Sequence, residues 1–160
     1  MKRNKQHKQR KGFSLLEVVI VVAILAILAA IGIPRMSRGS RGAGDSALRS
    51  NLSLLRNSID LFTAEHNGAF PGVATFTAQL TSFTDEFGAT SATKTVTHIF
   101  GPYMRRVPIL TVAAKKGKNG VSVDGAGDDD GWVYDPNSGA ITPNTTATEL
   151  DDAGVRYDTY

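Results

Sequence analysis

The sequence contains no cysteine among its 160 residues. Disulfide bonds, thiolate metal sites and a cysteine nucleophile are therefore excluded. Charged and strongly polar residues are also missing between positions 18 and 33, although charged residues make up 21% of the chain. This uneven distribution indicates an apolar segment joined to a remainder of about 125 residues, which is enough to bury one small core.

Basic residues are unevenly distributed as well. Six of the 18 Lys and Arg residues lie within the first 12 positions, so the rest of the chain has 12 basic and 15 acidic residues, a net charge of −3. A nucleic-acid-binding protein would carry its basic stripe on the folded part. We therefore expect no nucleic-acid partner, and we interpret the basic leader as the element that orients a membrane segment.

Signals for catalysis are sparse. The three histidines, His7, His66 and His98, form no apparent His/Ser/Asp constellation in the sequence. The glycines between positions 117 and 127 do not follow a strand and open a helix, as a phosphate-binding motif requires. We expect that the protein is not an enzyme.

What the chain does contain is an apolar run from Phe13 to Ile33. As a helix, this run would span about 31 Å, close to the hydrocarbon thickness of a bilayer. The basic leader predicts that residues 1–12 lie in the cytoplasm and that the bulk of the chain lies on the other side of the membrane. A secretory signal peptide has a similar layout, but its apolar region is shorter, and no small-x-small cleavage site follows this run. A plain uncleaved anchor remains an alternative.

Glu17 is the single acid in the apolar run. An ionised side chain within a spanning helix costs about 2.5–3.5 kcal/mol and usually has a partner. No Lys, Arg or His lies between Phe13 and Ile33 to provide one. Cleavage after Gly12 would create the missing cation, because the new α-amino group on Phe13 would lie one helical turn from Glu17 or could meet the Glu17 of a neighbouring copy.

The stretch Lys11-Gly12-Phe13-Ser14-Leu15-Leu16-Glu17, followed by a long apolar helix, resembles the cleavage and methylation motif of type IV pilins and type II secretion pseudopilins. The resemblance implies that a prepilin peptidase cuts after Gly12 and methylates Phe13. It also implies that Glu17 pairs with the terminus of a neighbouring subunit during assembly into a helical homo-oligomeric filament. Further implied partners are an inner-membrane assembly platform and minor pseudopilins.

The same resemblance implies an α+β, pilin-like fold. A long N-terminal helix, transmembrane in its first half, would pack on a small antiparallel β-sheet. We expect four segments: a cytoplasmic leader at 1–12 that is removed, a transmembrane and assembly helix at 13–34, a flexible segment with the amphipathic half of the helix at 35–66, and a periplasmic loop and sheet domain at 67–160.

Two further blocks, residues 101–108 with Gly-Pro-Tyr and residues 131–141, resemble major pseudopilins of the type II, or general secretion, pathway. They favour a pseudopilus subunit that drives protein export, anchored in the inner membrane and periplasmic after assembly. A type IV pilus or competence pilin is the nearest alternative. The alternative of a different class is a single-pass anchor with a calcium-binding or ligand-binding periplasmic domain that never polymerises.

The next part of the chain predicts a change in the helix. The stretch between about Pro34 and Gly44 is rich in glycine and serine, so we expect it to be weak or partly unwound. Asp45 is a good N-cap for the helix that follows, and Asn67-Gly68 is a natural left-handed cap at its end. The apolar residues of this helix alternate spacings of four and three and predict one buried face: Leu48, Leu52, Leu55, Ile59 and Phe62.

Two local elements are predicted downstream. The irregular apolar spacing after Ala69 favours a short helix around Thr77 to Phe87 that covers the sheet edge. Trp132–Tyr134 and Ala140–Thr142 are strand-like and flank a Pro-Asn-Ser-Gly turn, which predicts a hairpin.

Four carboxylates gather on one glycine-rich stretch: Asp124, Asp128, Asp129 and Asp130. Calcium prefers oxygen ligands on such a loop, and so much unneutralised charge on one turn is costly. The spacing does not match an EF-hand, because aligning Gly131 with the invariant glycine leaves Asn137 where the bidentate Glu should be. Major pseudopilins bind calcium in a C-terminal loop near this position, so the resemblance implies calcium ligands here. A solvated acidic turn is the alternative.

Overall fold

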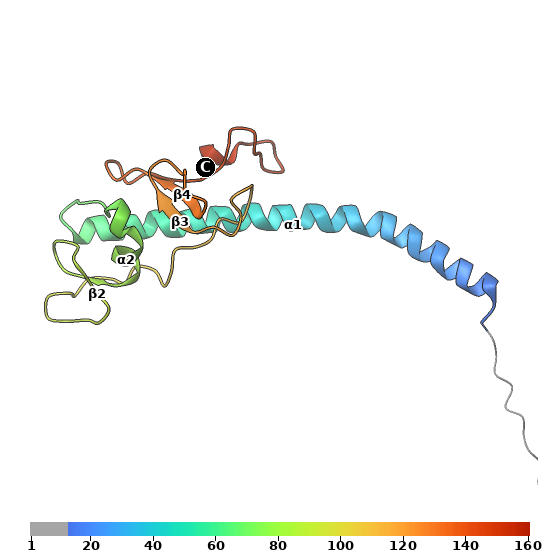
Figure 1. The fold of residues 1–160 in the computed structure, drawn as a ribbon, viewed down its shortest axis with the longest axis horizontal. Coiled ribbons are helices and arrows are strands. Elements are labelled where there is room, and N and C mark those ends of the chain that lie inside the picture. Colours follow the sequence, from blue (N-terminus) through green and yellow to red (C-terminus); the bar gives the residue numbers. More distant parts are fainter. Residues whose placement is uncertain (1–12) are drawn as a thin grey trace, which may run out of the picture. The chain divides into compact units, whose positions relative to one another are not determined.

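The computed structural model describes residues 13–160, except for the side chains of residues 31–38 and Ser40. The chain divides into two compact units, Met1–Gly39 and Ser40–Tyr160. Helix α1 (Leu15–Glu65) starts in the first unit and ends in the second (Figure 1). The predictions for the leader, including cleavage after Gly12, lie outside the described residues.

The backbone of α1 is helical without a break from Leu15 to Glu65. The expectation of a weak or partly unwound segment between about Pro34 and Gly44 is therefore wrong for this structure. Asp45 likewise lies inside the helix and is not its N-cap. A glycine within a formed helix costs only about 1 kcal/mol, whereas stopping and restarting the helix requires a second, unfavourable nucleus.

The second part of α1 is amphipathic, as predicted. The five residues of the predicted apolar face are each at most 2% exposed. The hydrophobic core that they enter also contains Phe76, Leu80, Met104, Val107, Leu110, Val112, Trp132, Tyr134, Ile141 and Tyr157. Each large apolar side chain stabilises the fold by about 1.5–3 kcal/mol when buried. Tertiary packing thus holds this part of the helix in place.

The predicted C-terminal cap of α1 is confirmed. The helix ends at Glu65, and Asn67 and Gly68 follow in the left-handed region with φ values of 54° and 84°. The amide of Gly68 donates to the carbonyl of Thr63 at 2.9 Å. This bond satisfies one of the carbonyls that a helix end leaves without a partner.

The helix predicted around Thr77 to Phe87 is shorter in the structure. This part of the chain forms four short elements: η1 (Val73–Thr75), α2 (Phe76–Thr81), β1 (Phe83–Thr84) and β2 (Thr90–Ser91). The carboxylate of Asp85 accepts hydrogen bonds from the amides of Phe87 at 3.0 Å and Ala89 at 2.8 Å. These bonds stabilise a turn in place of further helix, so β1 and β2 pair antiparallel.

The larger sheet consists of β3 (Gly120–Ser122), β4 (Asp130–Tyr134) and β5 (Ile141–Pro143), in that order. The predicted hairpin is confirmed, because β4 and β5 pair antiparallel with Tyr134 opposite Ile141. The expected antiparallel sheet is present between β4 and β5, whereas β3 departs from it and runs parallel to β4. The loop that follows Ser122 carries the chain back along β3, so that β4 starts beside the start of β3 and runs in the same direction. An antiparallel pair would need only a tight turn. The described elements form an α+β fold.

Candidate functional site

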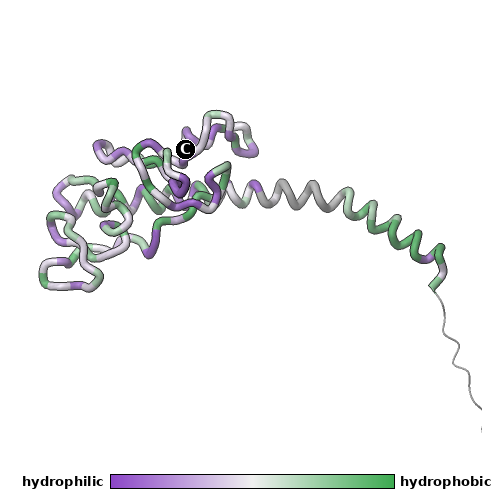
Figure 2. Tube along the Cα trace, in the orientation of Figure 1, coloured by the Kyte–Doolittle hydropathy of each residue, from purple (hydrophilic) through white to green (hydrophobic). Residues whose placement is uncertain are grey.

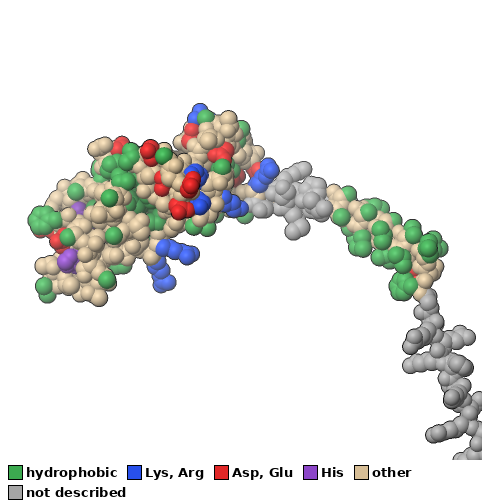
Figure 3. Space-filling model, in the orientation of Figure 1, with side chains coloured by type: hydrophobic (Ala, Val, Ile, Leu, Met, Phe, Trp, Pro, Cys, Tyr) green, Lys and Arg blue, Asp and Glu red, His purple; other side chains and the backbone are tan. Residues whose placement is uncertain are grey.

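The first part of α1 presents an apolar surface. Every side chain described between Phe13 and Ala30 is exposed, and the large apolar ones range from 47% exposed at Val18 to 82% at Leu15. Figure 2 colours most of this part of the helix as hydrophobic, and Figure 3 shows its apolar side chains. A helix that is apolar all round is normally buried, in a bilayer or among other helices. We therefore expect other molecules to cover this surface.

The membrane-spanning helix predicted at 13–34 includes residues 31–34, whose side chains the structure does not describe. Among the residues that the structure describes, no helix is both long enough and apolar enough to cross a membrane.

Glu17 lies in the first turn of α1, four positions after Phe13. The helix N-terminus favours a negative charge at this position, because the first amides of a helix point toward it. Among the residues that the structure describes, Glu17 forms no ion pair. The structure describes Phe13 and Glu17, whereas Gly12 lies outside the described residues. The processing and assembly roles of these three residues stay predictions.

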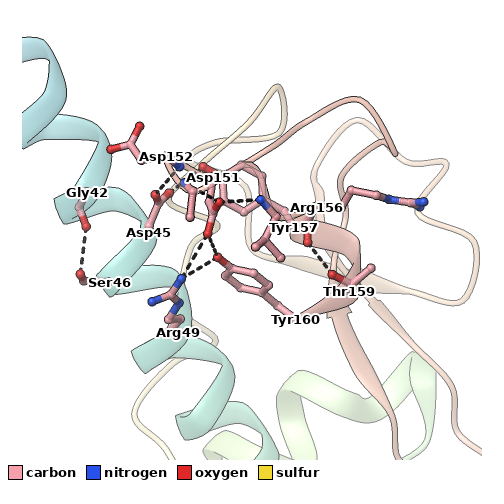
Figure 4. A network of polar contacts seen from close by, with 12 residues as sticks. Gly42, Asp45, Ser46, Arg49, Asp151, Asp152, Arg156, Tyr157, Thr159 and Tyr160 are labelled. Carbon is pink, nitrogen blue, oxygen red and sulfur yellow. Dashed lines mark hydrogen bonds and ion pairs between the residues drawn. The ribbon is translucent and has the colours of Figure 1, made fainter.

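A polar cluster joins α1 to the C-terminal segment (Figure 4). Asp45 is only 7% exposed, yet each of its two carboxylate oxygens accepts a hydrogen bond. One oxygen accepts from the Tyr157 hydroxyl at 2.6 Å, and the other accepts from the Asp152 amide at 3.3 Å. A buried carboxylate requires such donors. Asp45 therefore acts as a buried acceptor that holds the C-terminal segment against the helix.

Arg49, one turn further along α1, extends this cluster. Its Nη2 donates to the Asp151 carboxylate at 3.2 Å and to the Tyr160 hydroxyl at 2.8 Å, and the guanidinium carbon lies 5.1 Å from the centre of the Tyr160 ring. These bonds, with those of Asp45, join positions 102 to 112 residues apart in the chain. No short sequence pattern indicated them.

Asp151 is the acid at the centre of the C-terminal segment. Its carboxylate accepts from the Tyr160 hydroxyl and from the amides of Val155 and Ala153, the last two at 2.8 Å each. The hydrogen bond from Tyr160 is the largest cause that lowers the pKa of Asp151, followed by the amide of Val155. The ionised form of Asp151 is thus preferred in the folded protein.

We expect acid to destabilise the fold partly through Asp151. A lowered folded-state pKa means that its contribution is present above the ordinary value of 3.8 and is lost as pH falls through the folded value. Asp151→Asn should therefore lower the melting temperature at neutral pH and reduce its loss between neutral and acidic pH. The fluorescence of Trp132, the single tryptophan and fully buried, reports thermal unfolding.

The melting temperature of Asp151→Asn should still fall somewhat in acid, because other carboxylates also have lowered pKa values: Asp129, Asp135, Glu149 and Asp158. Asp152→Asn is the matched control, because this neighbour is exposed and only its backbone amide joins the cluster. An acid profile of Asp151→Asn as steep as that of the wild type would contradict the role of Asp151.

The two blocks that resemble pseudopilins contact one another in the core. Trp132 of the second block donates from Nε1 to the carbonyl of Pro108 in the first at 2.8 Å. Tyr103 packs edge-on against Phe62 with ring centres 5.7 Å apart, and its hydroxyl donates to the Glu65 carboxylate at 2.5 Å. Burial is the largest cause that raises the pKa of Tyr103, with the Glu65 bond second. Both blocks thus belong to the core around α1.

The four predicted calcium ligands lie on the loop between β3 and β4 and at the start of β4: Asp124, Asp128, Asp129 and Asp130. Their carboxylates do not converge. Asp129 pairs with the Lys118 ammonium at 2.7 Å, and Asp130 accepts from the amide of Gly127 at 2.8 Å. Within residues 13–160, as far as side chains are described, no group of three or more acidic, His or Cys side chains could hold a metal ion. The arrangement does not fit a calcium site, and calcium binding stays a matter for experiment.

Comparison with known proteins identifies the N-terminal segment. Residues 7–33 match the family described as the prokaryotic N-terminal methylation motif. No curated protein and no solved structure matches the chain. The match supports a type IV pilin-like protein, a subunit of a pilus or pseudopilus. It implies processing by a prepilin peptidase, a membrane-anchored precursor and assembly into a filament.

Proposed function

We propose that this chain is a structural subunit of the pseudopilus of a type II secretion system, which polymerises through its N-terminal helix to drive protein export. The observation that carries the proposal is the exposed apolar part of α1, with Glu17 as its single acid, directly after the methylation motif. In contrast, the apolar face of the second part of the same helix is buried in the core of its own unit. The chain thus combines an uncovered apolar helix with a separately folded unit.

Assembly would cover the exposed apolar side chains of this helix and would give Glu17 a partner. Sister helices can bury the apolar side chains between Phe13 and Ala30, each worth about 1.5–3 kcal/mol when large. The α-amino group that cleavage creates on Phe13 can neutralise the Glu17 of a neighbouring subunit. Because a buried charge without a partner is strongly destabilising, this pairing would also select the axial register of the subunits.

The secretion pseudopilus is favoured over a type IV or competence pilus by the blocks 101–108 and 131–141. These blocks lie in the part of the chain that folds around α1, and the Trp132–Pro108 hydrogen bond links them directly. Both blocks therefore contribute side chains to the core of this unit, although residues 101–108 belong to no helix or strand. The function is structural, with no catalytic role assigned to the chain.

Processing provides the first test of the proposal. Coexpression with a prepilin peptidase should remove Met1–Gly12 from the wild type and add one methyl group to Phe13, as measured by intact mass. Gly12→Val should retain the leader, because a side chain at this position blocks cleavage. Ser14→Ala, just after the cut, should be processed normally. An intact wild-type chain, or cleavage after Ile33, would exclude the pilin-like mechanism.

The choice between secretion and a pilus needs the native bacterium. Deletion of the gene should abolish the export of a set of proteins into the medium, and the wild-type gene should restore it. Loss of surface fibres with unchanged export would instead assign the chain to a pilus.

A further inference from the structure

The acidic loop, defined here as residues 123–130, contains the oxygen atoms that calcium loops use, namely carboxylates and backbone carbonyls. Two of its carboxylates already accept hydrogen bonds from the backbone of the same loop. Asp124 accepts from the Ala126 amide at 3.1 Å, and Asp130 accepts from the Gly127 amide at 2.8 Å. These oxygens stabilise turns within the loop.

Asn144, just after β5, spans the acidic loop with its side chain. Its Nδ2 donates to the carbonyls of Gly125 and Asp130, both at 2.8 Å. The orientation of the amide follows from chemistry, because a carbonyl oxygen can only accept. Its backbone is held as well, since the Asn144 amide donates to the carbonyl of Gly131 at 2.9 Å. The two hydrogens of one amide group thus join the two ends of the loop.

Gly125 shows how closely Asn144 approaches. A Cβ at position 125 would lie 2.7 Å from the Asn144 side chain, and φ at this glycine is +67°. Both the conformation and the contact therefore require glycine. The loop is shaped around the Asn144 side chain.

Two lysines approach the acidic loop from the turn that precedes β3. Lys115 donates from Nζ to the carbonyl of Gly127 at 2.8 Å, and Lys118 pairs with Asp129 at 2.7 Å. The Lys118 and Asp129 side chains are 41% and 86% exposed, so this pair contributes little stability by itself. Together, however, the two lysines place two positive charges against a loop with four carboxylates and reduce its net negative charge.

We propose that donors from this chain occupy the positions that a bound cation would take, so that the acidic loop keeps its conformation without calcium. Asn144 sets that conformation, and Lys115 and Lys118 reduce the negative charge. At these three carbonyls, a calcium ion would compete with the Asn144 amide and with the Lys115 ammonium, whose positive charge would repel it. The proposal is independent of the pseudopilus function, because a pilin-like subunit can assemble with or without a metal.

Thermal unfolding of the full-length chain in detergent tests this proposal. Trp132, two residues after Asp130 and fully buried, reports unfolding next to the loop. The wild type should melt at the same temperature in excess calcium and in excess EDTA, because a metal that binds the folded state would raise its stability. Asn144→Asp should melt lower by on the order of 5–10 °C, since it loses donors to two carbonyls and gains a charge.

Asn57→Asp is the matched control, because it makes the same chemical change at an exposed position of α1 and should melt close to the wild type. If Asn144→Asp does not fold, Asn144→Ala removes the donors without adding a charge and should also melt below the wild type. A wild-type melting temperature that falls in EDTA overturns the calcium independence. An Asn144→Asp melt equal to that of Asn57→Asp, or an Asn144→Ala melt equal to that of the wild type, overturns the role of Asn144.

Discussion

Glu17→Val is expected to leave processing and methylation intact while it lowers filament assembly on the order of 100-fold or more. The substitution leaves the α-amino group of Phe13 without its acid in an apolar interface, and an uncompensated buried charge costs about 3–5 kcal/mol. Valine is as apolar as its neighbours in α1, so the helix and its membrane affinity should not suffer. Intact mass measures processing, and shearing followed by sedimentation measures assembled filaments.

Two controls separate the charge of Glu17 from its shape. Glu17→Asp keeps the carboxylate on a shorter side chain and should retain part of the assembly, whereas Glu17→Gln keeps the shape without the charge and should fail like valine. Coassembly with wild-type subunits also distinguishes a subunit that cannot pair from one that never reaches the assembly platform. If Glu17→Val assembled normally, the pairing of Glu17 with a neighbouring terminus would be wrong.

Asp45→Ala is expected to lower the free energy of unfolding by about 2–4 kcal/mol. The substitution removes the acceptor of the buried Tyr157 hydroxyl and of the Asp152 amide, and it leaves a void beside the helix. As an N-cap, the same residue would contribute only about 1 kcal/mol. The size of the loss therefore tests the position of Asp45 inside an unbroken helix. Chemical denaturation followed by Trp132 fluorescence measures it.

A double-mutant cycle isolates the bond between Asp45 and Tyr157. Tyr157→Phe removes only the hydroxyl, whose pKa is raised mainly by burial and then by the hydrogen bond to Asp45. The two substitutions together should cost about 1 kcal/mol less than the sum of the single losses, because each removes the same bond. Ser46→Ala, at the exposed neighbouring position, should have little effect. Additive losses would show that the bond contributes nothing.

Asp45 shows where prediction from local sequence fails. An Asp after a glycine-rich stretch is a favourable helix start, and nothing nearby in the sequence contradicts that interpretation. The alternative partner, Tyr157, is 112 positions away. The expectation of a weak segment before Asp45 was wrong for a related reason. Helix propensity describes isolated segments, whereas a helix that is formed on both sides continues through residues that are poor helix formers.

The blocks around Tyr103 and Trp132 show a second limit of local prediction. Their likeness to pseudopilins marked them before any contact was known, and the structure places both in the core around α1. Their partners there, Phe62 and Pro108, could not be predicted from spacing. The fold explains why large aromatic side chains occur at these two positions, since both pack in the core around α1.

The sequence by itself determined the apolar helix with its single acid, the methylation motif, the amphipathic face from Leu48 to Phe62, the left-handed cap and the β4–β5 hairpin. Each of these depends on residues a few positions apart, so the periodicity or turn chemistry that specifies it is visible in one short stretch.

Only the tertiary structure decided that Asp45 is a buried acceptor, that β3 runs parallel to β4, and that Asn144 closes the acidic loop. These features join groups 10 to 112 positions apart. The physical reason is that a hydrogen bond or a strand pair forms wherever folding brings a donor to an acceptor, and hydrophobic packing of the whole unit decides which groups meet.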